Sequence, residues 1–362
     1  MANKVTMQQI ADQLGLSKFA VSKALSGKSG VSAETREKIV SVATQLGYFA
    51  NKQIKASASK RSEEAVSGGL PASGKETVIV LVPNVRNQTR ESSYWGRIID
   101  GIAAELQERE VGMVLVTEQF RDSFSNLINP NGVKGIIGVG FVSSQLLLEI
   151  RNLGIPFILV DHEDPLIPSD TLFMNNMECV RRVTNYLIGC GHRKLQFVGN
   201  IRYARSFADR WSGFRSMLEE HGLEQEQDRS LLGLTGEGRA EMLPDELEGA
   251  LGRMKEQHTL PTAMVCANDL IAMRVIGILG QLGIAVPEQC SVTGFDNIEE
   301  AAHAVPALST VHVDKEALGR RATEMLLRRV AHISEPQEKV LLSGEFILRD
   351  STVYPLLQTA LS

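Results

Sequence analysis

Two lysines, an aromatic ring and a hydroxyl group lie close together near the N-terminus, at Lys18, Phe19, Ser22 and Lys23. On a helix over residues 18–25 these side chains would point away from the apolar face. Such a set of donors and apolar groups is typical of a recognition helix that enters the major groove of DNA. The alternative is an ordinary helical hairpin whose lysines are solvated.

The elements that would position these side chains are two short helices joined by a tight turn. Gly15 supplies the backbone freedom that a sharp turn needs, and Ser17 stands at the N-cap of the second helix. Apolar residues at helical spacing form one stripe in each helix: Ile10, Ala11 and Leu14, then Val21, Ala24 and Leu25. A third helix, capped by Ser32 and ended by Gly47, would complete a headpiece of about 50 residues.

The charge of the chain is distributed unevenly. Residues 1–62 contain ten Lys and Arg against three acidic residues, a net charge of +7. Because the whole chain carries −5, the remainder carries −12. A basic head on an acidic body favours contact with DNA phosphates through the head alone, with binding that weakens as salt rises.

Short apolar, β-rich runs alternate with helical patterns from residue 78 onward. The predicted strands are 78–82, 112–117, 135–140, 156–161, 194–199, 263–268 and 290–296, and the predicted helices are 94–107, 143–153, 178–190, 209–221 and 269–282. This alternation predicts an α/β fold with parallel sheets. Because the runs are too numerous for one sheet, we expect two lobes with a ligand in the cleft at the carboxyl ends of their strands. The expected organisation is a headpiece at 1–50, a hinge and flexible linker at 51–76, and a two-lobed core at 77–362.

Several classes of protein are disfavoured. The sequence has no N-terminal apolar run and no stretch of 18 apolar residues, so we expect a cytoplasmic protein with no membrane partner. The cysteines lack CxxC spacing, so they should be buried small hydrophobes rather than metal ligands or disulfide partners: Cys179, Cys190, Cys266 and Cys290. We expect no metal and no cofactor.

Motifs along nearly the whole chain resemble those of the lactose-repressor/galactose-repressor family of bacterial transcription regulators. They are YxxN at 48–51, GCGHRKLQFVG at 189–199, DRWSGF at 209–214, CANDLIAM at 266–273, LGIAVPEQCSVTGFDNI at 282–298 and LSTVHVDKEALG at 308–319. The resemblance implies an all-α helix-turn-helix headpiece and a two-lobed core of the type I periplasmic-binding-protein kind. It also implies a repressor of carbohydrate-utilisation genes, which binds a palindromic operator as a homodimer and is switched by a small sugar-like effector.

Carried onto this chain, the family pattern assigns base contacts to Lys18, Phe19 and Lys23. It assigns contacts with the DNA backbone to Thr6, Ser17, Ser22, Ser26, Ser32 and Asn51. The alternative for Phe19 is a surface ring that covers its own helix.

The hinge departs from the family pattern. Where relatives usually carry Pro, Ala and a Leu that wedges into the minor groove, this chain has Ala50, Ile54 and Ser57. A serine cannot supply an apolar wedge, so either Ile54 takes over this role or the hinge stays disordered. We therefore expect a looser coupling between the lobes and DNA.

The resemblance implies an effector site built from aromatic, acidic and hydrogen-bonding side chains: Tyr94, Trp95, Asp161, Arg210, Asn268 and Asp296. Aromatic faces would take the C–H surface of a sugar, and the polar groups would bind its hydroxyls. Trp95 could instead belong to the interlobe core, and Asp296 could cap a helix.

An acidic sugar or a sugar phosphate is the alternative effector. Such an effector is favoured if Arg202 and Arg205 point inward from the loop that we expect before Arg210. It is also favoured because Lys134 and Asn175 stand where members of the family usually carry Asp. The alternative functions are a sugar-binding protein that serves a transporter and an enzyme on the same fold. The missing signal peptide and the basic head argue against the first. The lack of a nucleophile–base or metal-ligand pattern argues against the second, since His192 has no partnering Ser or Cys.

Overall fold

The structure is a computed structural model that describes residues 7–25, 77–83, 90, 92–117, 132–224, 226–234 and 244–353, and the single positions Thr35, Ile39 and Val42. The chain divides into two compact units, Met1–Ser73 and Gly74–Ser362, and each is considered by itself. Six expected contact or hinge residues lie outside the described residues: Thr6, Ser26, Ser32, Asn51, Ile54 and Ser57.

The N-terminal unit contains the predicted pair of helices, α1 (Met7–Leu14) and α2 (Lys18–Leu25). Ile10, Ala11 and Val21 are fully buried, which confirms the apolar stripes at these positions. Gly15 has a φ of +64°, a left-handed conformation that favours glycine. Ser17 Oγ accepts a hydrogen bond from Ala20 N at 3.1 Å, so Ser17 caps α2 as predicted.

The second unit contains two sheets, one parallel and one parallel except for its edge strand, which confirms the two-lobed α/β prediction. The sheet of lobe 1 has the order β10-β5-β4-β3-β1-β2, and all of its pairings are parallel. Its strands are β1 (Thr77–Leu81), β2 (Gly112–Val116), β3 (Val133–Val139), β4 (Phe157–Val160), β5 (Asp170–Met174) and β10 (Lys339–Leu342).

Helices cover both faces of this sheet. On one face α5 (Trp95–Glu108) and α12 (Lys315–Ala331) pack against each other, and α6 (Ser144–Asn152) covers the other face. A Cβ on Gly319 of α12 would lie 2.1 Å from the carbonyl oxygen of Ile98 in α5, and one on Gly101 of α5 would lie 2.2 Å from Glu316 O. The two helix backbones are therefore in direct contact.

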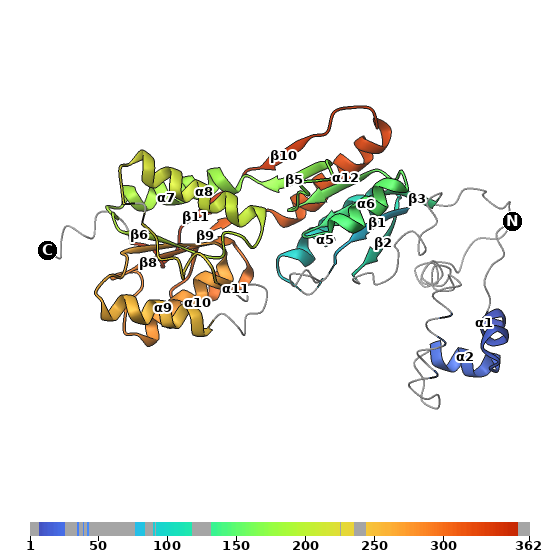
Figure 1. The fold of residues 1–362 in the computed structure, drawn as a ribbon, viewed down its shortest axis with the longest axis horizontal. Helices are drawn as coiled ribbons and strands as arrows, with labels where there is room; N and C mark the ends of the chain where they lie inside the picture. The colour runs from blue at the N-terminus through green and yellow to red at the C-terminus, as the bar shows by residue number, and fades with distance from the viewer. Residues whose placement is uncertain are drawn as a thin grey trace. The chain divides into compact units, whose positions relative to one another are not determined.

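The sheet of lobe 2 has the order β11-β9-β8-β7-β6. Its strands are β6 (Leu195–Val198), β7 (Ala263–Cys266), β8 (Ser291–Asp296), β9 (Ser309–His312) and β11 (Glu345–Ile347), of which β11 alone is antiparallel to its neighbour. Figure 1 shows α7 (Asn176–Gly189) and α8 (Arg205–Glu220) on one face, and α9 (Pro244–Glu256) and α10 (Asp269–Gln281) on the other. A short helix, α11 (Glu299–His303), follows β8.

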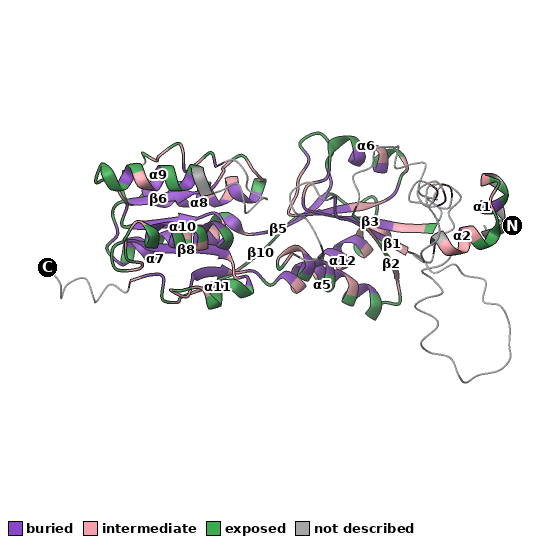
Figure 2. Cartoon of the chain, turned by 90° about the horizontal axis from the view of Figure 1, so that it is seen from below, coloured by how far each residue is buried: buried purple, intermediate pink, exposed green. Residues whose placement is uncertain are grey.

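Within the described residues the chain passes between the lobes at three places, residues 174–176, 312–315 and 342–345. Lobe 1 therefore receives α12 and β10 only after most of lobe 2. Figure 2 shows buried residues gathered along the strands and on the inner sides of the helices. The larger core cluster includes Val78 and Val80, whereas their neighbours Ile79 and Leu81 belong to the cluster under α6, as strand alternation requires.

The predicted elements agree with the observed ones to within a few residues, with one consequential error. Helix α8 begins at Arg205 rather than at 209, so Arg205 lies in a helix and not in a loop, and Arg210 lies in the second turn. The sequence patterns did not indicate β5, α9, α11, β9, α12, β10 or β11. All four cysteines are buried and free, as expected.

Candidate functional site

Arg210 of α8 is the centre of the candidate effector site. Its side chain is 3% exposed. Its Nε donates to Asn176 Oδ1 at 2.8 Å, Nη1 donates to Ala267 O at 2.5 Å, and Nη2 donates to Asp296 Oδ1 at 3.4 Å. The guanidinium carbon also lies 3.7 Å from the centroid of the Phe295 ring. These contacts hold the guanidinium in one orientation, with most of its donor directions occupied by the protein.

Two aspartates at strand ends lie close to this guanidinium. Asp161 directly follows β4 and Asp296 ends β8, and both have left-handed backbone angles, φ 53° and 111°. Ser206 Oγ donates to Asp161 Oδ2 at 3.4 Å. Such backbone angles in a non-glycine residue are costly and are maintained only where surrounding contacts fix them.

Burial controls the protonation of both carboxyl groups. It raises the pKa of Asp161 to about 7, with a further increase from the charge of Asp296 and an opposing effect of Arg210. Burial also raises the pKa of Asp296, and the charges of Arg210 and Lys315 oppose this increase. The two carboxylates thus compete for one guanidinium, so each disfavours the ionisation of the other.

The aromatic residues precede and begin α5. Burial raises the pKa of Tyr94 well above its ordinary value, and the charges of Asp161 and Asp296 raise it further while Arg210 opposes them. The ring of Trp95 meets that of Tyr94 edge to face, with centroids 4.8 Å apart, and packs against the main core cluster. Trp95 therefore contacts both the ring of Tyr94 and the apolar core.

Asn268 is placed differently from the other candidates. Its Oδ1 accepts from Ile271 N at 2.9 Å and caps α10, although the residue directly follows Ala267, which accepts from Arg210. Asp296 is not a helix cap, because α11 begins after Ile298 without a side-chain cap. The structure thus brings Tyr94, Asp161, Arg210 and Asp296 together, and it leaves Trp95 and Asn268 at the margin.

Three neighbouring residues were not predicted as members of the site. Asn176 and Phe295 contact Arg210 directly, and the ammonium of Lys315 binds the backbone beside Asp296. Phe295 lies within the GFDN motif and Lys315 within HVDKEALG. The sequence therefore places both residues in family motifs, but it does not predict that they contact Arg210 and Asp296.

Arg205 does not supply a free positive charge. It forms an ion pair with Glu163 of lobe 1, lies 3.4 Å from Asp209 Oδ2, and stacks 5.4 Å from the Phe173 ring centroid. Glu163 in turn pairs with Lys339. The charge of Arg205, which was the argument for an acidic effector, is therefore already paired within the protein.

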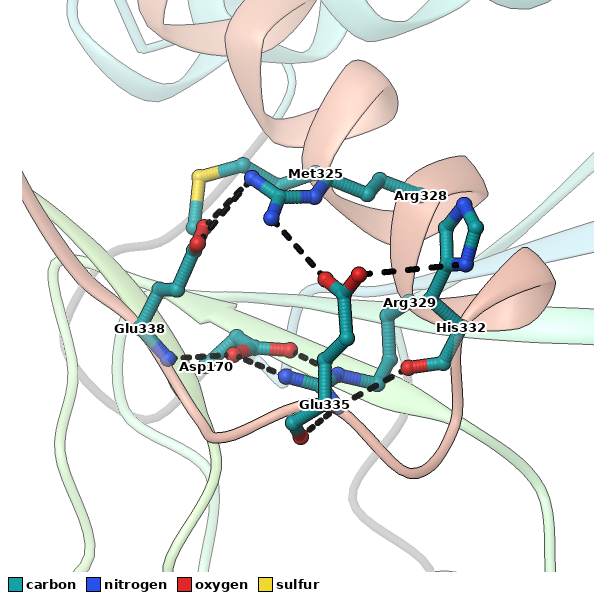
Figure 3. Close-up of a pocket in the computed structure, with 7 residues that line it drawn as sticks. All are labelled: Asp170, Met325, Arg328, Arg329, His332, Glu335 and Glu338. Carbon is teal, nitrogen blue, oxygen red and sulfur yellow. Dashed lines mark hydrogen bonds and ion pairs between the residues drawn. The ribbon is translucent and has the colours of Figure 1, made fainter.

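The hollow drawn in Figure 3 lies elsewhere, at the end of α12. It is lined by Asp170, Met325, Arg328, Arg329, His332, Glu335 and Glu338. Arg329 Nη2 donates to Asp170 Oδ1 at 2.9 Å and Arg328 Nη2 donates to Glu335 Oε2 at 2.9 Å. Because its charged groups satisfy one another and none is an effector candidate, we assign no ligand to this hollow.

The candidate DNA-reading helix α2 presents two of its predicted residues to solvent. Phe19 is 74% exposed and Lys18 is also exposed, while Ser22 and Lys23 are partly exposed. The ammonium of Lys23 lies 5.7 Å from the centroid of the Phe19 ring. An exposed apolar ring of this size is unfavourable in water, and a partner that covers it would remove this cost in free energy.

Neither a metal site nor a membrane span emerges from the part of the chain that the structure describes. Within the described ranges, no three His, Cys, Asp or Glu side chains are grouped as metal ligands. None of the described helices has the length and apolar character needed to cross a bilayer. His192 is buried, with Nδ1 3.0 Å from Thr262 Oγ1, as befits a structural histidine.

Comparisons with known proteins agree with this architecture. Residues 6–51 match the model of bacterial regulatory proteins of the lacI family, and residues 184–352 match that of a periplasmic binding protein-like domain. The chain is 26% identical to the HTH-type transcriptional repressors PurR of Haemophilus influenzae and of Vibrio vulnificus, over 96% of this chain and 98% of each relative.

Solved structures share the fold of both units. A complex of the transcriptional regulator CelR with cellobiose gives a TM-score of 0.67 at 22% identity, covering 96% of this chain and 99% of that one. The lac repressor dimer bound to operator and the anti-inducer ONPF gives 0.63 at 20% identity, covering 97% and 100%. With the helix-turn-helix and the two parallel-sheet lobes, these matches show that the chain belongs to the LacI family: it is a non-enzymatic, DNA-binding transcriptional repressor with a periplasmic-binding-protein-like effector domain.

Proposed function

We propose that this repressor acts in the cytoplasm as a homodimer on a palindromic operator, controls carbohydrate-utilisation genes, and is switched by a small neutral sugar. The proposed effector-binding residues are Tyr94, Trp95, Asp161, Arg210, Asn268 and Asp296. The observation that carries the proposal is the buried guanidinium of Arg210, which bonds Asn176, Ala267 O and Asp296, with the carboxyl of Asp161 and the phenol of Tyr94 within electrostatic range.

The charge balance favours a neutral polyol over an acid. Among the described residues, the carboxyls of Asp161 and Asp296 lie with two cations, the guanidinium of Arg210 and the ammonium of Lys315, and Arg205 is engaged by Glu163 and Asp209. An anionic ligand would therefore find no uncompensated positive charge among these groups, whereas sugar hydroxyls can donate to the carboxyl oxygens. One related structure holds cellobiose and another regulator of the same family holds ribose, which supports the sugar class.

For DNA recognition we propose base contacts by Lys18, Phe19 and Lys23. Backbone contacts are proposed for Thr6, Ser17, Ser22, Ser26, Ser32 and Asn51, and the hinge role for Ile54 and Ser57. The exposure of Phe19 supports its contact with an operator thymine. The loose-hinge hypothesis predicts that Ser57→Leu increases operator affinity and DNA bending, and unchanged values in a gel-shift series would contradict it.

Isothermal titration of the full chain tests the effector proposal. The probes are cellobiose, ribose, glucuronate, glucose 6-phosphate and the flat heterocycle guanine. We expect a neutral sugar to bind. The variant Asp296→Asn should lower the affinity for this sugar on the order of tenfold, since one charged acceptor is lost. Binding of glucuronate or the sugar phosphate alone would overturn the neutral class, and binding of guanine alone would overturn the sugar class.

Selection of bound duplexes from a random pool tests the DNA proposal. We expect a two-fold symmetric site whose two half-sites are spaced by whole helical turns. Repeating the selection with each probe shows whether the effector releases or recruits DNA. Enrichment of a single asymmetric half-site would contradict the homodimer on a palindrome.

A further inference from the structure

Lys315 is an unusual residue for its position. It is the first residue of α12, and its side chain is buried, with only 6% exposed. A cation at a helix N-terminus faces the positive end of the helix dipole, and burial adds a desolvation cost that lowers its pKa. Stability of the helix alone does not account for a buried lysine there.

The ammonium of Lys315 binds the backbone of lobe 2 beside the effector candidates. Its Nζ donates to Asp296 O at 2.6 Å and to Asn297 O at 3.3 Å, and a third bond runs to Val313 O at 3.2 Å. Because α12 packs in lobe 1, this side chain joins a helix of lobe 1 to the strand end that carries Asp296 in lobe 2.

The backbone that Lys315 binds is strained. Asp296 and Asn297 have φ values of 111° and 47°, and the carbonyl oxygens of both accept hydrogen bonds from the ammonium. Such angles persist only when surrounding contacts fix them. Other groups hold Asn297 through its side chain and amide: Arg349 Nη2 donates to Asn297 Oδ1 at 2.7 Å, and Asn297 N donates to Thr310 Oγ1 at 3.4 Å. Among the described residues, Lys315 is the group that binds both carbonyls.

We propose that Lys315 is a positioning residue: by holding the Asp296 and Asn297 carbonyls from lobe 1, it orients the Asp296 carboxylate against Arg210 for the effector. This inference rests on the proposed effector function of Asp296. Through these hydrogen bonds, Lys315 of lobe 1 directly fixes the position of Asp296 in lobe 2. The contact lies at residues 312–315, where the chain passes between the lobes for the second time.

Hydrogen exchange of the full chain, read by mass spectrometry, tests the positioning step without any ligand. Lys315→Met keeps the aliphatic stem and removes the donors, so amides of residues 297 and 298 should exchange about tenfold faster. Lys315→Arg, which can still donate to carbonyls, should restore slow exchange. Lys255→Met is the matched control, because Lys255 Nζ also donates to a backbone carbonyl, Leu282 O at 2.6 Å, far along the chain from the site.

The pattern of exchange separates positioning from general stabilisation. An increase confined to residues 296–299 supports the proposal, whereas an equal increase throughout lobe 2, or none, overturns it. Titration with cellobiose and ribose gives the second readout. Lys315→Met should lower the affinity for the sugar that the wild type binds by about tenfold, and Lys315→Arg should recover most of the lost affinity. If the wild type binds none of the probes, the proposed effector class fails, while the exchange result still decides the role of Lys315.

Discussion

The half-buried carboxyl group of Asp161 should make the stability of this repressor depend on pH. Its pKa rises from an ordinary 3.8 to about 7 in the folded chain. Between these values the folded state keeps a proton that the unfolded state has released, so stability decreases as the pH rises and the loss is complete above pH 7. From pH 5 to pH 8 the loss is about 3 kcal/mol, accumulated below pH 7 at roughly 1.36 kcal/mol for each pH unit. Because Asp161 is partly exposed, solvent screening reduces this figure to about 2 kcal/mol.

The variant Asp161→Asn removes this pH dependence while keeping the shape of the side chain. We expect the free energy of unfolding of the variant, minus that of the wild type, to increase by about 2 kcal/mol between pH 5 and pH 8. Urea denaturation at four pH values in this range measures it. Asp100→Asn, which removes an exposed carboxylate on α5, is the control and should follow the wild type. Parallel curves for Asp161→Asn and the wild type would refute the assignment of a buried, proton-binding carboxyl group.

Two further predictions concern the headpiece and the helix pair of lobe 1. Phe19→Ala should leave thermal stability unchanged, since the ring is 74% exposed. It should lower the affinity for the selected operator on the order of tenfold in a gel shift. A loss of stability without a loss of affinity would instead show that the Phe19 ring covers its own helix. Gly319→Ala should lower the free energy of unfolding by about 1–3 kcal/mol, because the new Cβ would lie 2.1 Å from Ile98 O. Gly277→Ala in α10, where nothing lies within 4 Å, is its control and should stabilise by about 0.5–1 kcal/mol; equal effects would contradict the close helix contact.

The sequence was sufficient for the fold class and for much of the candidate site. Continuous apolar runs such as 78–82 predicted buried parallel strands. The same runs placed Asp161 and Asp296 at strand ends from the sequence alone. The helix-turn-helix was specified by local signals, the positive φ of Gly15 and the cap at Ser17. These features depend on residues that are neighbours along the chain.

Features that depend on distant residues were not predictable. The strand β11 has three residues, Glu345 to Ile347, and is fixed by pairing with β9 rather than by its own periodicity. The early start of α8 at Arg205 is accompanied by ion pairs with Glu163 and Asp209. The contact of Lys315 with the Asp296 carbonyl depends on how the chain crosses between lobes, which hydrophobic patterns do not encode.

The return of the chain to lobe 1 has a consequence for biosynthesis. Helix α12 and strand β10 cover β3, β4 and β5 and pair with β5, yet they lie at residues 315–342, behind nearly all of lobe 2. A ribosome therefore releases the first five strands long before the segment that completes their sheet. Until then an apolar sheet face and the edge of β5 are open to chaperones or to neighbouring nascent chains. Premature termination after lobe 2 would thus damage the lobe that was made first.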